Sequence, residues 1–256
     1  MIDVRQLTSL PDLKEAVRLQ QVIWGFEEIE LIPLRLFVVA TKVGGHAFGA
    51  FDGKRMVGFC LAIPGVKAGP KTYLHSHMLG VLPEYRNARV GRMLKLAQRD
   101  EALSRDIDLI EWTFDPLEIK NAYFNIERLG AVVRRYVLNQ YGTTTSHLHG
   151  GLPTDRCIPE WWIASPRAEA IIAGKPFQRG PIEARISVTS DIAKIREHDS
   201  KRAGEIQRSI SEQFLSCFSR DLAVVGFEKS ETAGAYLLGP WNNGAPLTEP
   251  RASASG

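Results

Sequence analysis

The 256-residue sequence holds very little cysteine: only Cys60, Cys157 and Cys217, with no C-x-x-C pair among them. Three thiols without paired spacing exclude a disulfide-stapled scaffold and the common zinc-finger arrangements. We therefore expect reduced thiols in a cytoplasmic protein. Cys60 lies in an apolar run and is expected to be a small buried side chain.

Long apolar runs and an excess of one charge are absent as well. No run approaches the ~20 apolar residues that a membrane-spanning helix needs, and the opening segment MIDVRQLTSLPDLKEAV contains no signal-peptide core. The 32 basic and 29 acidic residues leave a net charge of +3, which is too balanced to favour nucleic acid or an anionic membrane as a partner. The 44% hydrophobic content is ordinary for a globular protein.

Alternation and helical periodicity predict an α/β (α+β) domain over residues 1–165, with a mixed, mostly antiparallel central sheet flanked by helices. The apolar run 107–114 is typical of a central strand buried on both faces. Strands are expected near 2–7, 46–51, 56–63, 72–81, 107–114, 131–138 and 157–163, and helices near 11–24, 34–42, 90–104 and 118–129.

The sequence pattern predicts three shorter parts after residue 165. Residues 166–181 are expected to form a short helix and a linker, and residues 182–240 a smaller C-terminal α/β unit. The small, polar residues of 241–256 predict a disordered tail. The pattern leaves open whether 182–240 completes the first sheet or folds separately.

The segment HSHMLGVLPEYRNARVGRML, residues 75–94, predicts a strand, a short turn and the start of a helix. The first amides of a helix have no partner within it, and the helix dipole is positive at that end. With arginines and one glycine in the turn, this arrangement suits an anion such as a phosphate. A solvated basic turn is the alternative.

The same segment resembles the acyl-CoA binding motif of the GNAT superfamily of N-acetyltransferases, which reads Arg/Gln-x-x-Gly-x-Gly/Ala after a strand ending in Val-x-Pro. The order of elements from residue 2 to about 141 resembles that superfamily too. The matching positions are Val81, Pro83, Tyr85, Arg86 and Gly91.

The resemblance implies that acetyl-CoA or another acyl-CoA is the co-substrate, with no metal. Its pantetheine would lie along the strand end and its pyrophosphate on the turn amides. One side chain of the later helix, 118–129, would also contact the pantetheine. The implied residues are Leu79, Gly80 and Val81 for pantetheine, Arg86, Asn87, Ala88, Arg89, Val90, Gly91 and Arg92 for pyrophosphate, and Asn121 in the later helix.

Two positions depart from the family pattern. Arg89 stands where the family has its first motif glycine, so its Cβ narrows the approach to the pyrophosphate while its guanidinium could add a phosphate contact. Ile126 stands where many members have a tyrosine that protonates the leaving thiolate. Tyr123, Asn125, Tyr141 or water are the alternatives for that role.

His75 and His77 lie two apart on the predicted strand, so we expect both on one face. The arylalkylamine N-acetyltransferases carry a histidine pair at the same offsets from the motif, and there the pair is associated with deprotonating the amine. The resemblance implies a base role for His77 first and His75 second, which suits a side chain that titrates near pH 7. Hydrogen-bonded core histidines are the alternative.

Asp115 and Glu111, near the end of the central strand, could hold an ammonium group or act as an alternative base. Asp115 before Pro116 is equally well a helix N-cap. Trp112 is a candidate substrate platform, although tryptophans of this kind are more often in the core. The loop HLHGGLPTDR adds His149, Asp155 and Arg156 as candidate substrate contacts, with a structural salt bridge as the alternative.

The sequence thus predicts an acyl-CoA-dependent N-acyltransferase that acts on the primary amine of a small molecule by direct attack in a ternary complex. Resemblance to a bacterial GNAT subgroup implies an amino acid as one acceptor and succinyl-CoA as one donor. Two alternatives remain open: a non-catalytic acyl-CoA sensor on the same fold, and a protein-lysine acetyltransferase. The oligomeric state cannot be read from the sequence.

Overall fold

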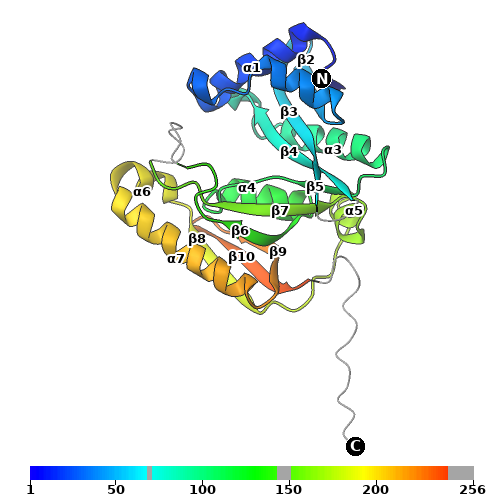
Figure 1. Cartoon of the computed structure of the whole chain (residues 1–256). Coiled ribbons are helices and arrows are strands. Elements are labelled where there is room, and N and C mark those ends of the chain that lie inside the picture. The colour runs from blue at the N-terminus through cyan, green and yellow to red at the C-terminus, as the bar shows by residue number, and fades with distance from the viewer. Residues whose placement is uncertain (68–70, 143–150, 242–256) are drawn as a thin grey trace, which may run out of the picture.

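The computed structural model describes residues 1–67, 71–142 and 151–241. Its strands form a ten-stranded sheet in the order β1-β2-β3-β4-β5-β7-β6-β9-β10-β8, with helices around it (Figure 1). Among the described residues, neighbouring strands pair antiparallel except β4 with β5, which pair parallel. This mixed, mostly antiparallel sheet flanked by helices confirms the predicted fold class.

The first part of the chain builds one end of the sheet. The Ser9 side chain caps the first helix by accepting from the Asp12 amide, and Gly25, with a φ of 67°, ends it. Asp52-Gly53 turns one strand into the next, as the sequence predicts. The elements are β1 (Ile2–Gln6), α1 (Leu10–Trp24), η1 (Glu28–Glu30), α2 (Leu34–Lys42), β2 (His46–Asp52), β3 (Arg55–Val66) and β4 (Thr72–Val81).

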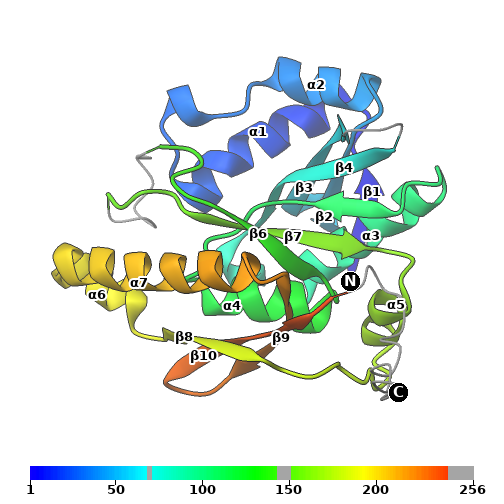
Figure 2. The same cartoon turned by 60° about the horizontal axis from the view of Figure 1, so that its bottom comes forward.

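The middle of the chain crosses from β4 into the second half of the sheet. The long helix α3 leads from the turn after β4 to β5, and α5 follows β7 (Figure 2). The elements are η2 (Pro83–Tyr85), α3 (Val90–Leu103), β5 (Leu109–Glu111), α4 (Ile119–Tyr123), η3 (Phe124–Arg128), β6 (Val132–Val137), β7 (Arg156–Trp162) and α5 (Pro166–Ile172).

The last part of the chain continues the same sheet. Val133 of β6 pairs with Val224 of β9, and one apolar cluster joins Phe114, Ile126 and Val133 to residues of the C-terminal elements. The pattern had left open whether this part completes the sheet, and the structure shows that it does. The elements are β8 (Ala184–Thr189), α6 (Ile192–His198), α7 (Ser200–Phe218), β9 (Leu222–Lys229) and β10 (Ala233–Pro240).

Three expectations needed correction. The predicted strand 107–114 is reduced to β5, and Phe114 forms only an isolated bridge to Cys157. The predicted helix 118–129 is a short α4 that continues as a π-helix, η3. The buried face of α3 includes Lys95 and Gln98, whereas Met93 and Leu96, which periodicity places on the apolar side, are only half-buried.

Within residues 1–67, 71–142 and 151–241, none of the helices is both long and apolar enough to cross a membrane. The same described residues contain no group of three or more His, Cys, Asp or Glu side chains that could hold a metal ion.

Candidate functional site

The strands β4 and β5 run side by side for only two residue pairs, Leu74 with Ile110 and His75 with Glu111. Beyond them β4 continues to Val81, and it pairs on its other edge with β3. Among the described strands, none pairs with β4 from Ser76 onward on the edge that faces β5. The pairing between β4 and β5 therefore ends at this point, which we call the wedge, and the unpaired backbone edge of β4 leads towards the turn before α3.

A β-bulge lies at the point of the wedge. Leu61 of β3 pairs with Met78 and Ala62 pairs with Ser76, so His77 is the extra residue without a partner on β3. A bulge bends its strand and re-aims the side chains next to it. The rings of His75 and His77 lie with their centroids 5.9 Å apart, as the expectation of a shared face requires.

The pKa values of His75 and His77 both lie below the ordinary value for histidine. Burial, and secondarily the neighbouring His77, lower the pKa of His75 to about 4. Partial burial of the ring also lowers the pKa of His77, although the residue as a whole is exposed. Both rings are therefore neutral at pH 7 and free to accept a proton. His77 is the more exposed of the two residues, so an acceptor amine reaches it more readily.

The histidine face continues into a row of buried acids. The register places His75 opposite Glu111, and Glu111 opposite Glu160 of β7. Arg135 joins the two carboxylates, with its Nη2 at 2.6 Å from Glu111 and its Nε at 3.5 Å from Glu160. Lys67 also pairs with Glu111. Buried charges are stable only when they are paired. The ion pairs therefore fix the positions of the Glu111 and Glu160 carboxylates beside the histidines.

The opposite face of the wedge carries a buried lysine on α3. Lys95 Nζ donates a hydrogen bond of 2.7 Å to Ser76 Oγ and lies 3.7 Å from the centroid of the Trp112 ring. Ser76 Oγ in turn donates to Gln98 Oε1 at 2.9 Å. Burial lowers the pKa of Lys95 to about 7. Trp112 packs edge-on against Trp161 in the core, and we keep it out of the substrate contacts.

The turn that connects β4 to α3 holds two residues in the left-handed region. Asn87 has a φ of 71° and Arg89, the residue before α3, a φ of 62°. Arg89 thus adopts the backbone conformation that glycine takes at no steric cost. No side chain caps α3 at Arg89, so the first amides of the helix, at Val90, Gly91 and Arg92, have no intrahelical partner.

Three arginines, Arg86, Arg89 and Arg92, lie in or next to this turn in the sequence. Arg86 Nε donates to Val81 O at 3.4 Å, and Arg92 Nη2 donates to Ile172 O at 2.7 Å. Burial, and then the charges of Arg128 and Arg89, lower the pKa of Arg92. Positive charge is therefore concentrated near the start of α3, and together with the unpaired amides it favours an anion there.

The strand end next to the turn is closely packed. A Cβ added to Gly80 would lie 2.7 Å from Trp24 Cη2, so a side chain there would collide with α1. A Cβ added to Gly91 would meet Leu79 and Val81 only at 3.8 Å and 3.9 Å, which is ordinary contact. Leu79 and Val81 therefore face α3 along the free edge of β4.

Other candidate residues have structural contacts. Asp115 is buried; its Oδ2 pairs with Arg196 at 2.7 Å and its Oδ1 accepts from the Leu117 amide. Asp155 accepts from Ser211 Oγ at 2.7 Å and from the Asn139 amide at 2.9 Å. These contacts tie loops to the C-terminal part of the chain, and we give Asp115 and Asp155 no part in the chemistry.

The remaining candidate residues differ in burial. Arg156 is buried, donates to the Asp155 carbonyl at 2.9 Å and lies over the Tyr141 ring. Asn121 is exposed on α4, whereas Ile126 is fully buried in η3. His149 lies outside the described residues.

Sequence reasoning missed Glu160 and Lys95. Lys95 follows buried Leu94 and precedes buried Gln98 by three positions, so helical spacing could have indicated a lysine on the inner face. No local signal marks Glu160, because its neighbourhood with Glu111 depends on the register between two strands distant in sequence.

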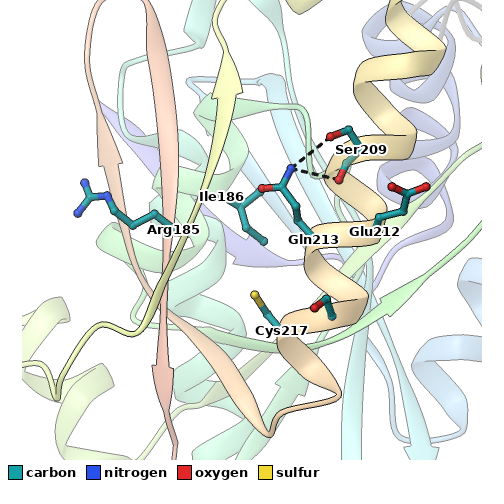
Figure 3. Close-up of a pocket in the computed structure, with 7 residues that line it drawn as sticks. Arg185, Ile186, Ser209, Glu212, Gln213 and Cys217 are labelled. Carbon is teal, nitrogen blue, oxygen red and sulfur yellow. Dashed lines mark hydrogen bonds between the residues drawn. The ribbon is translucent and has the colours of Figure 1, made fainter.

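The structure has a hollow elsewhere. An open hollow of about 370 Å³ lies between β8 and α7, lined in part by Arg185, Glu212, Gln213 and Cys217 (Figure 3). β8 is the far edge strand, six places from β4 in the sheet order. Gln213 there bonds Ser209 of its own helix. The hollow is separate from the wedge.

No protein-family model matches the sequence. No curated protein matches it significantly.

The fold, in contrast, has solved counterparts. A protein described as a GNAT-family acetyltransferase from Desulfovibrio desulfuricans superposes with a TM-score of 0.51 over 64% of this chain and 100% of its own, at 14% identity. NAA60 of Arabidopsis thaliana, solved with acetyl-CoA, superposes with a TM-score of 0.52 over 64% of this chain and 99% of its own, at 15% identity. The wedge, the bulge and the helix N-terminus therefore belong to a chain that has the GNAT N-acetyltransferase fold.

Proposed function

We propose that this protein transfers an acyl group from acyl-CoA to the primary amine of a small molecule. The observation that carries the proposal is the parting of β4 and β5 after His75 and Glu111, which leaves a free backbone edge running to a helix N-terminus rich in arginine. The solved counterpart bound to acetyl-CoA supports the choice of ligand.

In this proposal the pantetheine arm adds to the free edge of β4 as an extra strand would. Leu79, Gly80 and Val81 line the arm. The turn amides and Arg86, Arg89 and Arg92 hold the pyrophosphate, because unpaired amides and fixed positive charge both favour a phosphate. The thioester then reaches the point of the wedge, beside the bulge at His77.

The acceptor arrives as an ammonium ion, since the pKa of an alkylamine is ~10.4. His77, neutral at pH 7, accepts the proton, and the free amine attacks the thioester carbonyl. Backbone amides near Leu79 polarise that carbonyl. Much of the rate comes from holding amine and thioester in contact.

The first test is calorimetric titration with acetyl-CoA and with succinyl-CoA, on wild type and on Arg89→Gly. Binding of either donor supports the assignment of the wedge and indicates which acyl chain to pursue. Binding only after Arg89→Gly would mean that the arginine closes the site, as in a protein that has lost the activity. Failure of both proteins to bind either donor would contradict the acyltransferase proposal.

The second test is thiol release from the bound donor across a panel of free amines and lysine-containing peptides. We expect His77→Ala to lower kcat by ~10²-fold or more, the usual contribution of a general base, with donor affinity unchanged. His198→Ala on α6, which removes an exposed histidine, is the matched control. Normal turnover by His77→Ala would remove it from the mechanism. Turnover on peptides alone would favour a protein-modifying enzyme.

A further inference from the structure

Lys95 is a buried lysine to which the fold described above gives no structural role. It is 2% exposed, and it lies between the side chains of Ser76 and Trp112. Among the described residues, no carboxylate forms an ion pair with it. Burying an unpaired ammonium is costly, and an apolar residue would fill the same space without that cost.

The surroundings of Lys95 leave hydrogen-bond donors unused. An ammonium has three N–H groups, and among the described residues Nζ donates one hydrogen bond, to Ser76 Oγ. Next to it, Gln98 Nε2 is buried and has no acceptor among the described residues. Cys60 is the nearby titratable group on β3, and burial raises its pKa to about 12, so it stays a neutral thiol. Lys95 Nζ and the Gln98 side chain thus both contact Ser76 Oγ, and both keep N–H groups with no hydrogen-bond acceptor among the described residues.

That place is the point of the wedge. Ser76 and Trp112 directly follow His75 and Glu111, the last residues through which β4 and β5 pair. Ser76 faces α3, whereas His75 and His77 lie together on the other face of β4. The ammonium of Lys95 and the two imidazoles thus approach the end of the free β4 edge from opposite sides.

We propose that Lys95 is the proton donor to the thiolate of CoA that leaves during acyl transfer. The inference rests on the proposed function. The amine nitrogen forms a bond to the carbonyl carbon, the carbon–sulfur bond breaks, and its electron pair goes to sulfur. A proton moves from Lys95 Nζ to sulfur, which gives the free thiol and a neutral lysine that solvent re-protonates. The attacking ammonium loses its first proton to His77 before the attack, and the nitrogen loses a second proton to water as the amide forms, so the complete reaction releases one proton.

This assignment fills the role that Ile126 cannot serve, since an alkyl side chain has no proton to give. A pKa of about 7 suits the step, because a thiol of pKa ~8.5 takes a proton readily from such an acid. Lys95 also lies on the face opposite the base, so the two proton transfers do not compete for one group.

The test compares wild type with Lys95→Met and Lys95→Arg, using the donor and the amine on which wild type is active. We expect Lys95→Met to lower kcat by ~10²-fold or more with the Kd for the donor changed less than ~3-fold. Wild-type kcat should fall as the pH rises through about 7, because the acid form is lost, and Lys95→Met should lack this alkaline limb. Lys201→Met, an exposed position on α7, is the control.

Lys95→Arg separates proton transfer from charge alone. Arginine keeps the positive charge but does not release a proton near neutral pH, so we expect kcat to stay low. Recovery of kcat by Lys95→Arg would overturn proton donation, and so would wild-type kcat with an unchanged pH profile in Lys95→Met. Donor binding or thiol release absent from wild type itself would instead count against the proposed function.

Discussion

At the scale of single residues, the turn before α3 combines backbone strain with the groups that we propose to bind the pyrophosphate. Arg89 has a φ of 62°, a conformation that costs a non-glycine residue roughly 1–2 kcal/mol. Arg86, three positions earlier, has a φ of −65°, which any residue adopts without strain. The same substitution at the two sites therefore has opposite consequences for stability.

We predict that Arg89→Gly raises the free energy of unfolding by up to about 1 kcal/mol, because relief of strain outweighs the added chain entropy of glycine. Arg86→Gly should lower it by about 0.5–1 kcal/mol. Urea unfolding of both variants measures the difference. A loss of stability in Arg89→Gly would show that the arginine side chain stabilises the turn by more than its backbone costs.

The buried lysine makes a second prediction at this scale. The pKa of Lys95 falls from 10.5 to about 7 in the folded protein, so the unfolded chain binds more protons between these values. The stability of wild type should therefore rise relative to Lys95→Met as the pH goes from about 7 to about 10. Below pH 7 Lys95→Met should be the more stable protein. Paired urea titrations at several pH values check this, and a pH-independent difference would contradict a depressed pKa.

At the scale of elements, a buried ion pair joins the loop after β5 to α6. Arg196 Nη2 lies 2.7 Å from Asp115 Oδ2, and the two side chains are 7% and 9% exposed. Arg196→Met leaves Asp115 buried without this partner, so we expect a loss of about 3 kcal/mol in the free energy of unfolding.

Arg202→Met removes the exposed pair with Glu205 and should change stability by less than about 1 kcal/mol. Thermal melting of the two variants gives the comparison. Equal melting temperatures would mean that solvent replaces the contact at Asp115.

The sequence predicted an element correctly where residues close to it in the chain determine where it begins and ends. The Asp52-Gly53 hairpin, the glycine stop at Gly25 and the strand, turn and helix of residues 75–94 are each marked by neighbouring residues, and each forms as expected. β5 ends early because its length is decided by the strands beside it, and no periodicity reports that. The acid row and the Lys95 contacts likewise depend on register and on which helix face is buried.

At the scale of the whole molecule, the C-terminal elements share a core with the middle of the chain. Phe114, Ile126 and Val133 pack in one cluster with Ile186, Phe214 and Tyr236. The proposed domain boundary between 165 and 182 would divide this cluster.

We predict that a chain ending at residue 181 does not fold cooperatively, because it exposes one side of that cluster to water. It should bind a dye for apolar surface and melt without a sharp transition. Adding the 182–256 segment as a separate polypeptide should restore part of the transition. A cooperative melt for the shortened chain alone would establish the boundary as a true domain limit.

The sheet order has a mechanical consequence. β1 to β4 lie on one side of β5, and the other five strands lie on the other side. The halves of the sheet are thus hydrogen-bonded to each other through a strand of three residues, and directly beyond it no described strand pairs with this edge of β4. A pantetheine arm bound between them would add backbone hydrogen bonds where the two halves of the sheet are otherwise joined only through β5. Occupancy by the donor would then stiffen the whole molecule, and resistance to heat or proteolysis would report the presence of CoA.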